Sequence, residues 1–249
     1  MKKFAYILAL ASILFQVSSC KKAENRTCFK STGKDKTISI SLPYFNKLWL
    51  NPHLEYVLIQ DSTDRLVITG GENLVNLVEW NIDSDDVLTI TNGNKCNFLR
   101  KLDKKIRVEI HFTNVYNLHF EGTEPLTNVD TLDMPYFVML IRDGAGSVNL
   151  NLKSIVLQAD ISHGWGDYTL GGKTQIAHIA ARSNGYCDVT ALHVTDSMYV
   201  SSETSGTIKV RVDGIPLTGE IRALGDIWYY GTPSSISVTE LSKGKLIGK

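Results

Sequence analysis

Hydrophobic and polar residues alternate along the C-terminal half of the chain, in short segments that each follow a glycine. These glycines recur at intervals of 19 to 21 residues: Gly146, Gly166, Gly185, Gly206, Gly225 and Gly244. The second and fourth residues after each glycine are apolar or aromatic: Val148, Leu150, Tyr168, Leu170, Cys187, Val189, Ile208, Val210, Ile227 and Tyr229, with Leu246 alone in the last repeat. The residue between them is mostly polar. Such alternation is typical of a strand with one buried face.

A repeat of about 20 residues with strand character indicates a β-solenoid. A second strand is expected before each glycine, at residues 137–141, 176–180, 198–202 and 236–239. The glycine fits a corner, where a positive φ angle would disfavour residues that carry a Cβ atom. The predicted fold is therefore an all-β, right-handed parallel β-helix with clear coils over residues 137–249.

The N-terminal half also has strand character but no clean period. Candidate strands lie at residues 37–41, 44–50, 56–60, 65–69, 75–80, 87–91, 105–112 and 116–120, separated by Asp, Asn and Gly clusters. Such clusters mark turns. Residues 37–249 are expected to form a single solenoid domain whose N-terminal half is irregular and rich in β-strands.

The first 20 residues read as a secretory leader. A basic start is followed by an apolar stretch, and Val17-Ser18-Ser19-Cys20 resembles a bacterial lipobox. The prediction is a signal peptide over residues 1–19, lipidation of Cys20, and a tether over residues 20–36. A plain signal peptide or a membrane helix is the alternative, but the apolar stretch is short for a membrane span. Lys21 favours the outer membrane over the inner one, and surface exposure stays open.

Charge is distributed unevenly along a chain whose formal net charge is zero. Residues 21–36 carry a net charge of +4, and residues 37–249 carry −6. A basic tether suits anionic lipid head groups, although it also fits a simple solvated linker. An acidic domain argues against nucleic acid as a partner.

Cysteine use adds one open question. The chain has Cys20, Cys28, Cys96 and Cys187. Cys187 occupies an inward position of the repeat and is expected to be a small buried hydrophobic residue. In an oxidising envelope Cys28 and Cys96 could pair, although Cys28 falls within the tether, so a disulfide and two free thiols both remain open.

Two segments resemble a known bacterial family. Gly70-Gly71-Glu72-Asn73-Leu74 with the strand at residues 87–90, and the ending at residues 224–233 followed by residues 241–246, are similar to the putative auto-transporter adhesin, head GIN domain family. The resemblance runs from about Phe45 to the C-terminus, although the corners have fewer Ser-Gly repeats than is usual there. It implies a β-solenoid anchored in the cell envelope, and it carries no catalytic residues.

One outward column of the predicted coils is charged. Three residues before each glycine stand Asp143, His163, Arg182, Glu203 and Arg222, followed by Leu241. The column could be a recognition stripe for an ionic ligand. It could equally be a surface salt ladder, in which each exposed pair contributes less than about 1 kcal/mol.

Exposed aromatic residues form a second candidate surface. Trp228 and Tyr230 are expected on the outer face of one strand, with Lys209 and Arg211 in the same columns one coil earlier and Trp165 at another corner. Aromatic faces beside cationic side chains suit sugar rings or a partner protein. Alternatively, residues 233–249 cover these aromatics as a cap, or the face forms a dimer.

The pattern contains no recognisable catalytic or metal-binding constellation. Asp167 and Asp226 fall three coils apart, roughly 14 Å at strand spacing. The acidic segment at residues 83–86 lacks the glycine and distal glutamate of an EF-hand and reads as a turn. Neither metal-ligand spacings nor a serine-hydrolase elbow occur in the sequence. We therefore expect no cofactor and no metal, and a protein that is not an enzyme.

These observations favour a non-catalytic, lipid-anchored envelope protein that contacts glycans or envelope or host proteins. Two alternatives stay open. One is a polysaccharide-degrading enzyme, since parallel β-helices host such activities. The other is a structural or sensing accessory without a soluble ligand.

Overall fold

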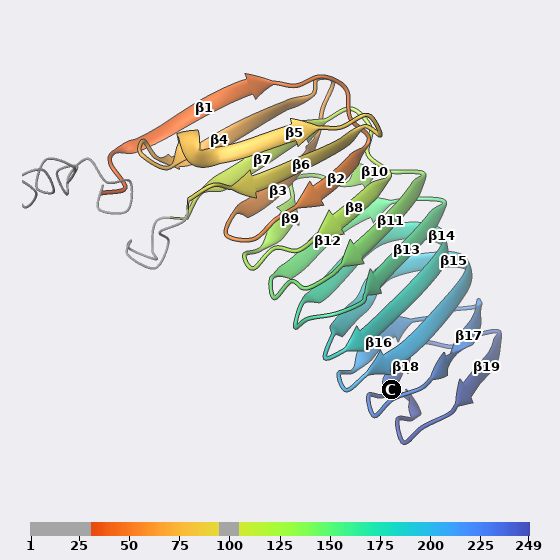
Figure 1. The fold of residues 1–249 in the computed structure, drawn as a ribbon. Helices are drawn as coiled ribbons and strands as arrows, with labels where there is room; N and C mark the ends of the chain where they lie inside the picture. Colours follow the sequence, from red (N-terminus) through yellow and green to blue (C-terminus); the bar gives the residue numbers. More distant parts are fainter. Residues whose placement is uncertain (1–30, 95–104) are drawn as a thin grey trace, which may run out of the picture.

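The computed structural model describes residues 31–94 and 105–249, which form a β-solenoid of about seven turns. Figure 1 shows its coils stacked along one axis, with the chain entering at one end and finishing at the other. The prediction of an all-β solenoid is confirmed. Within the described ranges, no helix is long and apolar enough to cross a membrane.

The coils stack as two long ladders of strands. The first ladder runs through β5 (Val78–Ile82), β6 (Val87–Asn92), β2 (Lys47–Leu50), β8 (Asn117–Phe120), β11 (Tyr136–Ile141), β13 (Val156–Ile161), the second halves of β14 (Asp167–Ser183) and β15 (Tyr186–Thr204), β17 (Pro216–Ile221) and β19 (Ser235–Glu240). The second runs through β1 (Asp35–Ser41), β4 (Arg65–Gly71), β7 (Arg107–Phe112), β3 (Glu55–Gln60), β9 (Leu126–Asn128), β12 (Ser147–Lys153), the first halves of β14 and β15, β16 (Ile208–Arg211), β18 (Ile227–Tyr230) and β20 (Leu246–Gly248). The short β10 (Leu132–Asp133) pairs with the end of β12, and η4 (Val75–Leu77) is a single 3₁₀ turn.

The interior follows the alternation of the sequence. The apolar residues two and four places after the repeat glycines are buried from Val148 through Ile227, whereas Tyr229 in the last full coil is only partly buried. Each fully buried aliphatic side chain contributes about 1.5–3 kcal/mol relative to an exposed one. Cys187 is a free, buried thiol in this stack, as its inward position predicts.

The repeat glycines are needed for close packing between coils rather than for an unusual backbone angle. A Cβ atom on Gly206 would lie 2.2 Å from the carbonyl oxygen of Gly185, and one on Gly225 would lie 1.9 Å from that of Gly206. None of the six has a positive φ angle, so the expectation of a left-handed corner is wrong. At Gly146, Gly206, Gly225 and Gly244 an added Cβ would first meet a backbone carbonyl oxygen of the preceding coil, whereas at Gly166 and Gly185 it would meet the side chain of Ile141 or Ile161.

The N-terminal half closes one end of the solenoid. The coil formed by β2 and β3 lies between β6–β7 and β8–β9, so the order of coils in space differs from the order in sequence. Beyond it the strands become antiparallel, with β1 on β4, β4 on β7 and β5 on β6. This arrangement explains why the N-terminal half has strands but no period.

The opposite end is another coil rather than a cap. Residues 235–248 supply β19 and β20, which extend the two parallel ladders. Ile236 and Leu241 of this coil are 47% and 55% exposed. Among the described residues nothing pairs with the outer edges of β19 and β20.

Three predictions from the sequence concern residues outside the described ranges. The signal peptide at residues 1–19 with its lipidation site Cys20, most of the tether, and the pairing of Cys28 with Cys96 all fall there. They stay predictions.

Candidate functional site

The charged column is only partly continuous in the structure. Arg182 on β14 lies directly beside Glu203 on β15, and Arg222 follows in the next coil. Asp143 and His163 lie one residue farther along the corner, where the Asp143 amide donates to the His163 carbonyl at 3.0 Å. The places in line with Arg182 are taken by Arg142 and Ser162, so the prediction of a single column through Asp143 and His163 is wrong. The corners before Gly146 and Gly166 hold one residue more than the later corners, which shifts the register.

The charged side chains that remain in line have local partners. Arg182 Nε lies 3.8 Å from Glu203 Oε2, and its guanidinium also binds Asp160. Arg222 Nε lies 2.7 Å from Oε1 of Glu220, which is two residues earlier in the same coil. These side chains are partly exposed, so each pair contributes at most about 1 kcal/mol. The geometry is that of surface ion pairs between and within coils.

Trp228 lies between two lysines rather than presenting a bare ring. Lys209 Nζ is 5.8 Å from the Trp228 ring centroid and 5.3 Å from that of Tyr186, while Lys249 Nζ is 4.3 Å from Trp228. We call Tyr186, Lys209, Trp228 and Lys249 the cation–π stack. The hydrogen bond with Tyr186 raises the pKa of Lys209, and the Asp188 carboxylate 3.7 Å away adds to the shift. The ammonium groups approach Trp228 from the coils on its two sides, so a sugar ring would have to displace one of them.

Arg211 and Tyr230 form a second pair on the same two strands, β16 and β18, two residues beyond Lys209 and Trp228. Arg211 donates to the Thr190 carbonyl at 3.3 Å and pairs with Asp213 at 3.5 Å. Tyr230 is partly buried beside it in the next coil. Trp165 is 73% exposed at the corner before β14, in a different part of the solenoid. The structure therefore brings Lys209 beside Trp228 and Arg211 beside Tyr230, as predicted, and leaves Trp165 apart.

A groove lies where the second ladder bends toward the first, over β10, β12 and β14. It encloses a cavity of about 370 Å³. Its lining residues come from three successive coils: Asp133, Pro135, Lys153, Ser154, Ile155, Lys173, Thr174 and Gln175. This volume is within the range of about 300–1,000 Å³ usual for small-ligand sites.

Charged residues form one side of the groove in strict register. Asp133 pairs with Lys153, Lys153 with Lys173, and Lys173 with His193 along the parallel ladder. Lys153 Nζ binds Asp133 Oδ2 at 3.0 Å. Lys173 is exposed, and its ammonium group has neither a hydrogen bond nor an ion pair within the described part of the chain.

The floor and the opposite side of the groove are not charged. Ser154 Oγ donates to Thr174 Oγ1 at 2.8 Å, and the Thr174 hydroxyl contacts the Ile176 carbonyl at 3.1 Å. These buried hydroxyls satisfy one another, as buried polar groups usually do. Pro135 and Ile155 stand exposed beside the charged residues, and the Ile155 side chain is 39% accessible.

Sequence reasoning missed this groove although a signal is present. Asp133, Lys153, Lys173 and His193 are spaced 20 residues apart, the same period as the glycines. The period alone does not reveal that these residues line a concave surface, because concavity depends on where each coil bends.

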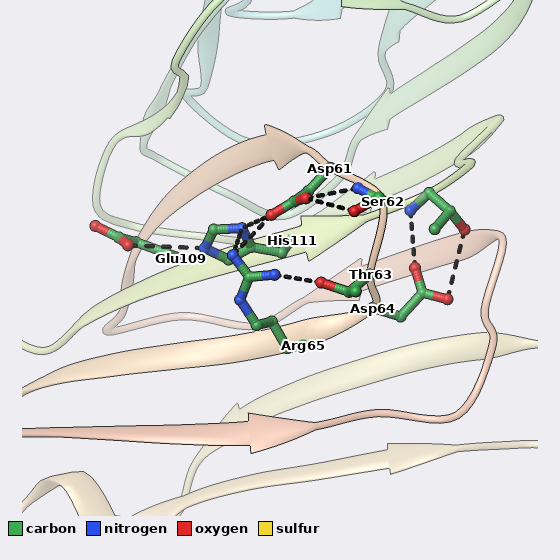
Figure 2. Close-up of polar contacts among 8 residues, drawn as sticks. Asp61, Ser62, Thr63, Asp64, Arg65, Glu109 and His111 are labelled. Carbon is green, nitrogen blue, oxygen red and sulfur yellow. Dashed lines mark hydrogen bonds and ion pairs between the residues drawn. The ribbon is translucent and has the colours of Figure 1, made fainter.

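A second polar cluster, at the N-terminal end, is fully paired (Figure 2). Arg65 Nη2 donates to Asp61 Oδ2 at 2.7 Å, and His111 Nδ1 lies 3.0 Å from the same oxygen. The backbone amide of Ser62, together with Arg65 and His111, lowers the pKa of Asp61 to about 2. The cluster joins the β3–β4 turn to β7. Since its groups are occupied by one another, it acts as a structural tie.

Metal-binding geometry is not found in the described ranges. No group of three or more His, Cys, Asp or Glu side chains there could hold an ion. In the acidic segment at residues 83–86, Asp83 Oδ1 accepts from the amides of Asp85 and Val87 at 2.9 and 3.0 Å. This pattern is that of a turn closed by its own aspartate.

Comparisons with known proteins agree with this architecture. The family described as putative auto-transporter adhesin, head GIN domain, matches residues 44–233. A putative adhesin from Bacteroides fragilis superposes with a TM-score of 0.77 at 22% identity, covering 87% of this chain and 97% of that one. A putative adhesin from Parabacteroides merdae gives 0.63 at 19% identity, covering 88% and 98%. One from Parabacteroides distasonis gives 0.59 at 18% identity, covering 87% and 98%. Curated proteins include no significant match.

Proposed function

The chain belongs to the putative auto-transporter adhesin, head GIN domain family, and from that premise we propose that it is a lipid-anchored envelope protein that binds a glycan through the side of its solenoid. Family membership itself supports an adhesin-like, non-catalytic role at the cell envelope or surface. The lipid anchor and the glycan go beyond what family membership supports.

The observation that carries the binding role is the groove over β10, β12 and β14. It combines a cavity of about 370 Å³ with an exposed lysine, Lys173, that has no partner among the described residues. A concave site with an unsatisfied charge is the usual starting point for a binding-site assignment.

The predicted anchor leaves the groove accessible from outside the membrane. The tether leads into β1, which lies in the antiparallel end of the solenoid (Figure 1). With Cys20 lipidated, that end is nearest the membrane, and the later coils extend away from it. The net charge of +4 in residues 21–36 adds attraction to anionic head groups.

The alternative of a polysaccharide-degrading enzyme fits the groove poorly. Glycoside hydrolysis generally needs two carboxylates flanking the scissile bond. The groove has a single carboxylate, Asp133, and Lys153 binds it at 3.0 Å. We therefore favour binding without turnover.

A glycan array with the purified full chain tests the proposal, alongside adhesion of cells that produce or lack the protein. We expect saturable glycan binding and a loss of adhesion in the deletion strain. Reducing-sugar release and absorbance of unsaturated products should stay at background. Binding to no glycan on the array, or turnover of one, would overturn the proposed function.

A further inference from the structure

We propose that the groove over β10, β12 and β14 recognises a carboxylated saccharide, with Lys173 binding the carboxylate. The inference rests on the proposed glycan-binding function and specifies the class of glycan. It follows from the charges, the apolar surface and the shape of this one site.

Among the cations that line the groove, Lys153 is paired with Asp133, whereas Lys173 has no carboxylate partner among the described residues. Its cationic neighbour in the ladder is Lys153, at the strand spacing of about 4.8 Å. Like charges directly opposite one another on a sheet are destabilising. The Asp133 carboxylate neutralises the charge of Lys153, whose Nζ lies 3.0 Å from Asp133 Oδ2. Asp133 is two coils away from Lys173, however, and does not neutralise it. A bound carboxylate beside Lys173 relieves the remaining repulsion.

The apolar side of the groove fits a sugar ring. Pro135 and Ile155 lie in adjacent coils next to the charged row, and both are exposed. The C–H face of a pyranose packs on such a surface. Gln175 continues this side in the following coil, where its exposed amide can exchange hydrogen bonds with ring hydroxyls.

Asp133 is held firmly enough to serve as a hydroxyl acceptor. Gln60 donates from its side-chain amide to the Asp133 carbonyl at 2.9 Å and accepts from the Asp133 amide at 2.7 Å. These two bonds fix the backbone of Asp133 against β3. The groove thus presents a cation for the carboxylate, an apolar surface for the ring, and the polar side chains of Asp133 and Gln175 for its hydroxyls.

A chain of sugars fits better than a single ring. A second cavity of about 140 Å³, lined by Gln60, Val129 and Leu132 among others, lies where β10 approaches β3. The two cavities are neighbours, because Gln60 of the second one is hydrogen-bonded to Asp133 of the groove. The overall charge of −6 in residues 37–249 opposes ligands of very high charge density and suits a sparsely charged glycan.

The experiment is a calorimetric titration of the purified full chain with oligogalacturonate, oligoglucuronate and a sialylated oligosaccharide. Each acid is paired with its methyl ester, which keeps the ring and removes the charge. At least one acid should bind about tenfold or more tightly than its ester, as expected when a charged hydrogen bond is lost. Equal binding of every acid and its ester would overturn carboxylate recognition.

Two variants test whether the acid binds at the groove. Lys173→Gln should weaken binding of the acid about tenfold or more and leave binding of the ester unchanged. Lys243→Gln removes another exposed lysine, outside the groove, and should bind as the wild type does. Thermal melting of both variants checks the fold. A Lys173→Gln protein that melts normally and binds the acid like the wild type overturns the assignment.

The outcomes also separate this inference from the proposed function. If the wild type binds neutral glycans on the array but none of the three acids, the groove assignment fails and the glycan-binding role stands. If it binds no glycan of either kind, the proposed function fails as well.

Discussion

Gly225 lies directly against Gly206 of the preceding coil, so that a Cβ atom on Gly225 would approach the Gly206 carbonyl oxygen to 1.9 Å. The same relation links Gly206 to Gly185, at 2.2 Å. At these two corners the absence of a Cβ atom therefore allows successive coils to stack this closely. Because every interior ladder depends on that spacing, the corner is a sensitive point of the fold.

The first prediction tests this contact. Gly225→Ala must push two backbones apart and should lower the free energy of unfolding by more than about 2 kcal/mol. Gly171→Ala is the matched control, because its Cβ would make only an ordinary contact, 3.6 Å from the Ala191 Cβ. Urea denaturation of both variants measures the difference. Equal stability losses would contradict the close-approach explanation.

Much of this fold could be predicted from the sequence because burial and strand geometry share a period of two residues. Val148, Leu170 and Val210 are inward as their spacing from a glycine requires. The reason for the glycines was harder to infer. A local sequence suggests a backbone angle, whereas the contact between Gly206 and Gly225 exists only once the coils are stacked.

The order of the N-terminal coils could not be predicted. Local sequence identifies a strand but not the strand beside it, and the insertion of β2 and β3 between later segments is a tertiary choice. Likewise, one extra residue in the corners before Gly146 and Gly166 displaced Asp143 and His163 from the charged column. A fixed offset from each glycine does not detect such a change.

The second prediction concerns Trp228, whose ring lies between Lys209 and Lys249. Trp228→Ala should lower stability by about 1–3 kcal/mol, since it removes two cation–π contacts and partly buried surface. It should leave glycan binding unchanged, because the ring is already covered. Trp165→Ala, at a position 73% exposed, is the control and should not change the melting temperature. If Trp228→Ala loses glycan binding while its stability is unchanged, the cation–π stack is a ligand site and the prediction is wrong.

The third prediction concerns the anchor. Cys20→Ala removes the only cysteine that follows Val17-Ser18-Ser19, so the precursor should stay without lipid and leave the membrane fraction. Detergent partitioning and metabolic labelling with a fatty acid measure the change. Cys28→Ala is the control and should remain membrane-bound. Partitioning of Cys20→Ala like the wild type would refute the anchor assignment.

The fourth prediction uses the cluster that joins the β3–β4 turn to β7. The pKa of Asp61 is about 2 in the folded protein, below the ordinary value of 3.8, because Ser62, Arg65 and His111 stabilise its charged form. A carboxyl whose pKa is lowered by folding stabilises the fold above its unfolded pKa, and this contribution is lost as the pH falls through the folded pKa. Unfolding should therefore become easier between about pH 4 and pH 2.

Asp61→Asn identifies how much of that pH dependence belongs to this carboxyl. The variant should be less stable than the wild type at pH 7, because Arg65 loses its charged partner at 2.7 Å. The difference between the two proteins should shrink as the pH drops toward 2, where the wild-type carboxyl also becomes neutral. Asp196→Asn, which replaces an exposed carboxyl outside the cluster, is the control. Its free energy of unfolding should differ from that of the wild type by the same amount at every pH. A constant difference between Asp61→Asn and the wild type at every pH would mean that the ion pair with Arg65 contributes nothing and that packing alone holds the β3–β4 turn against β7.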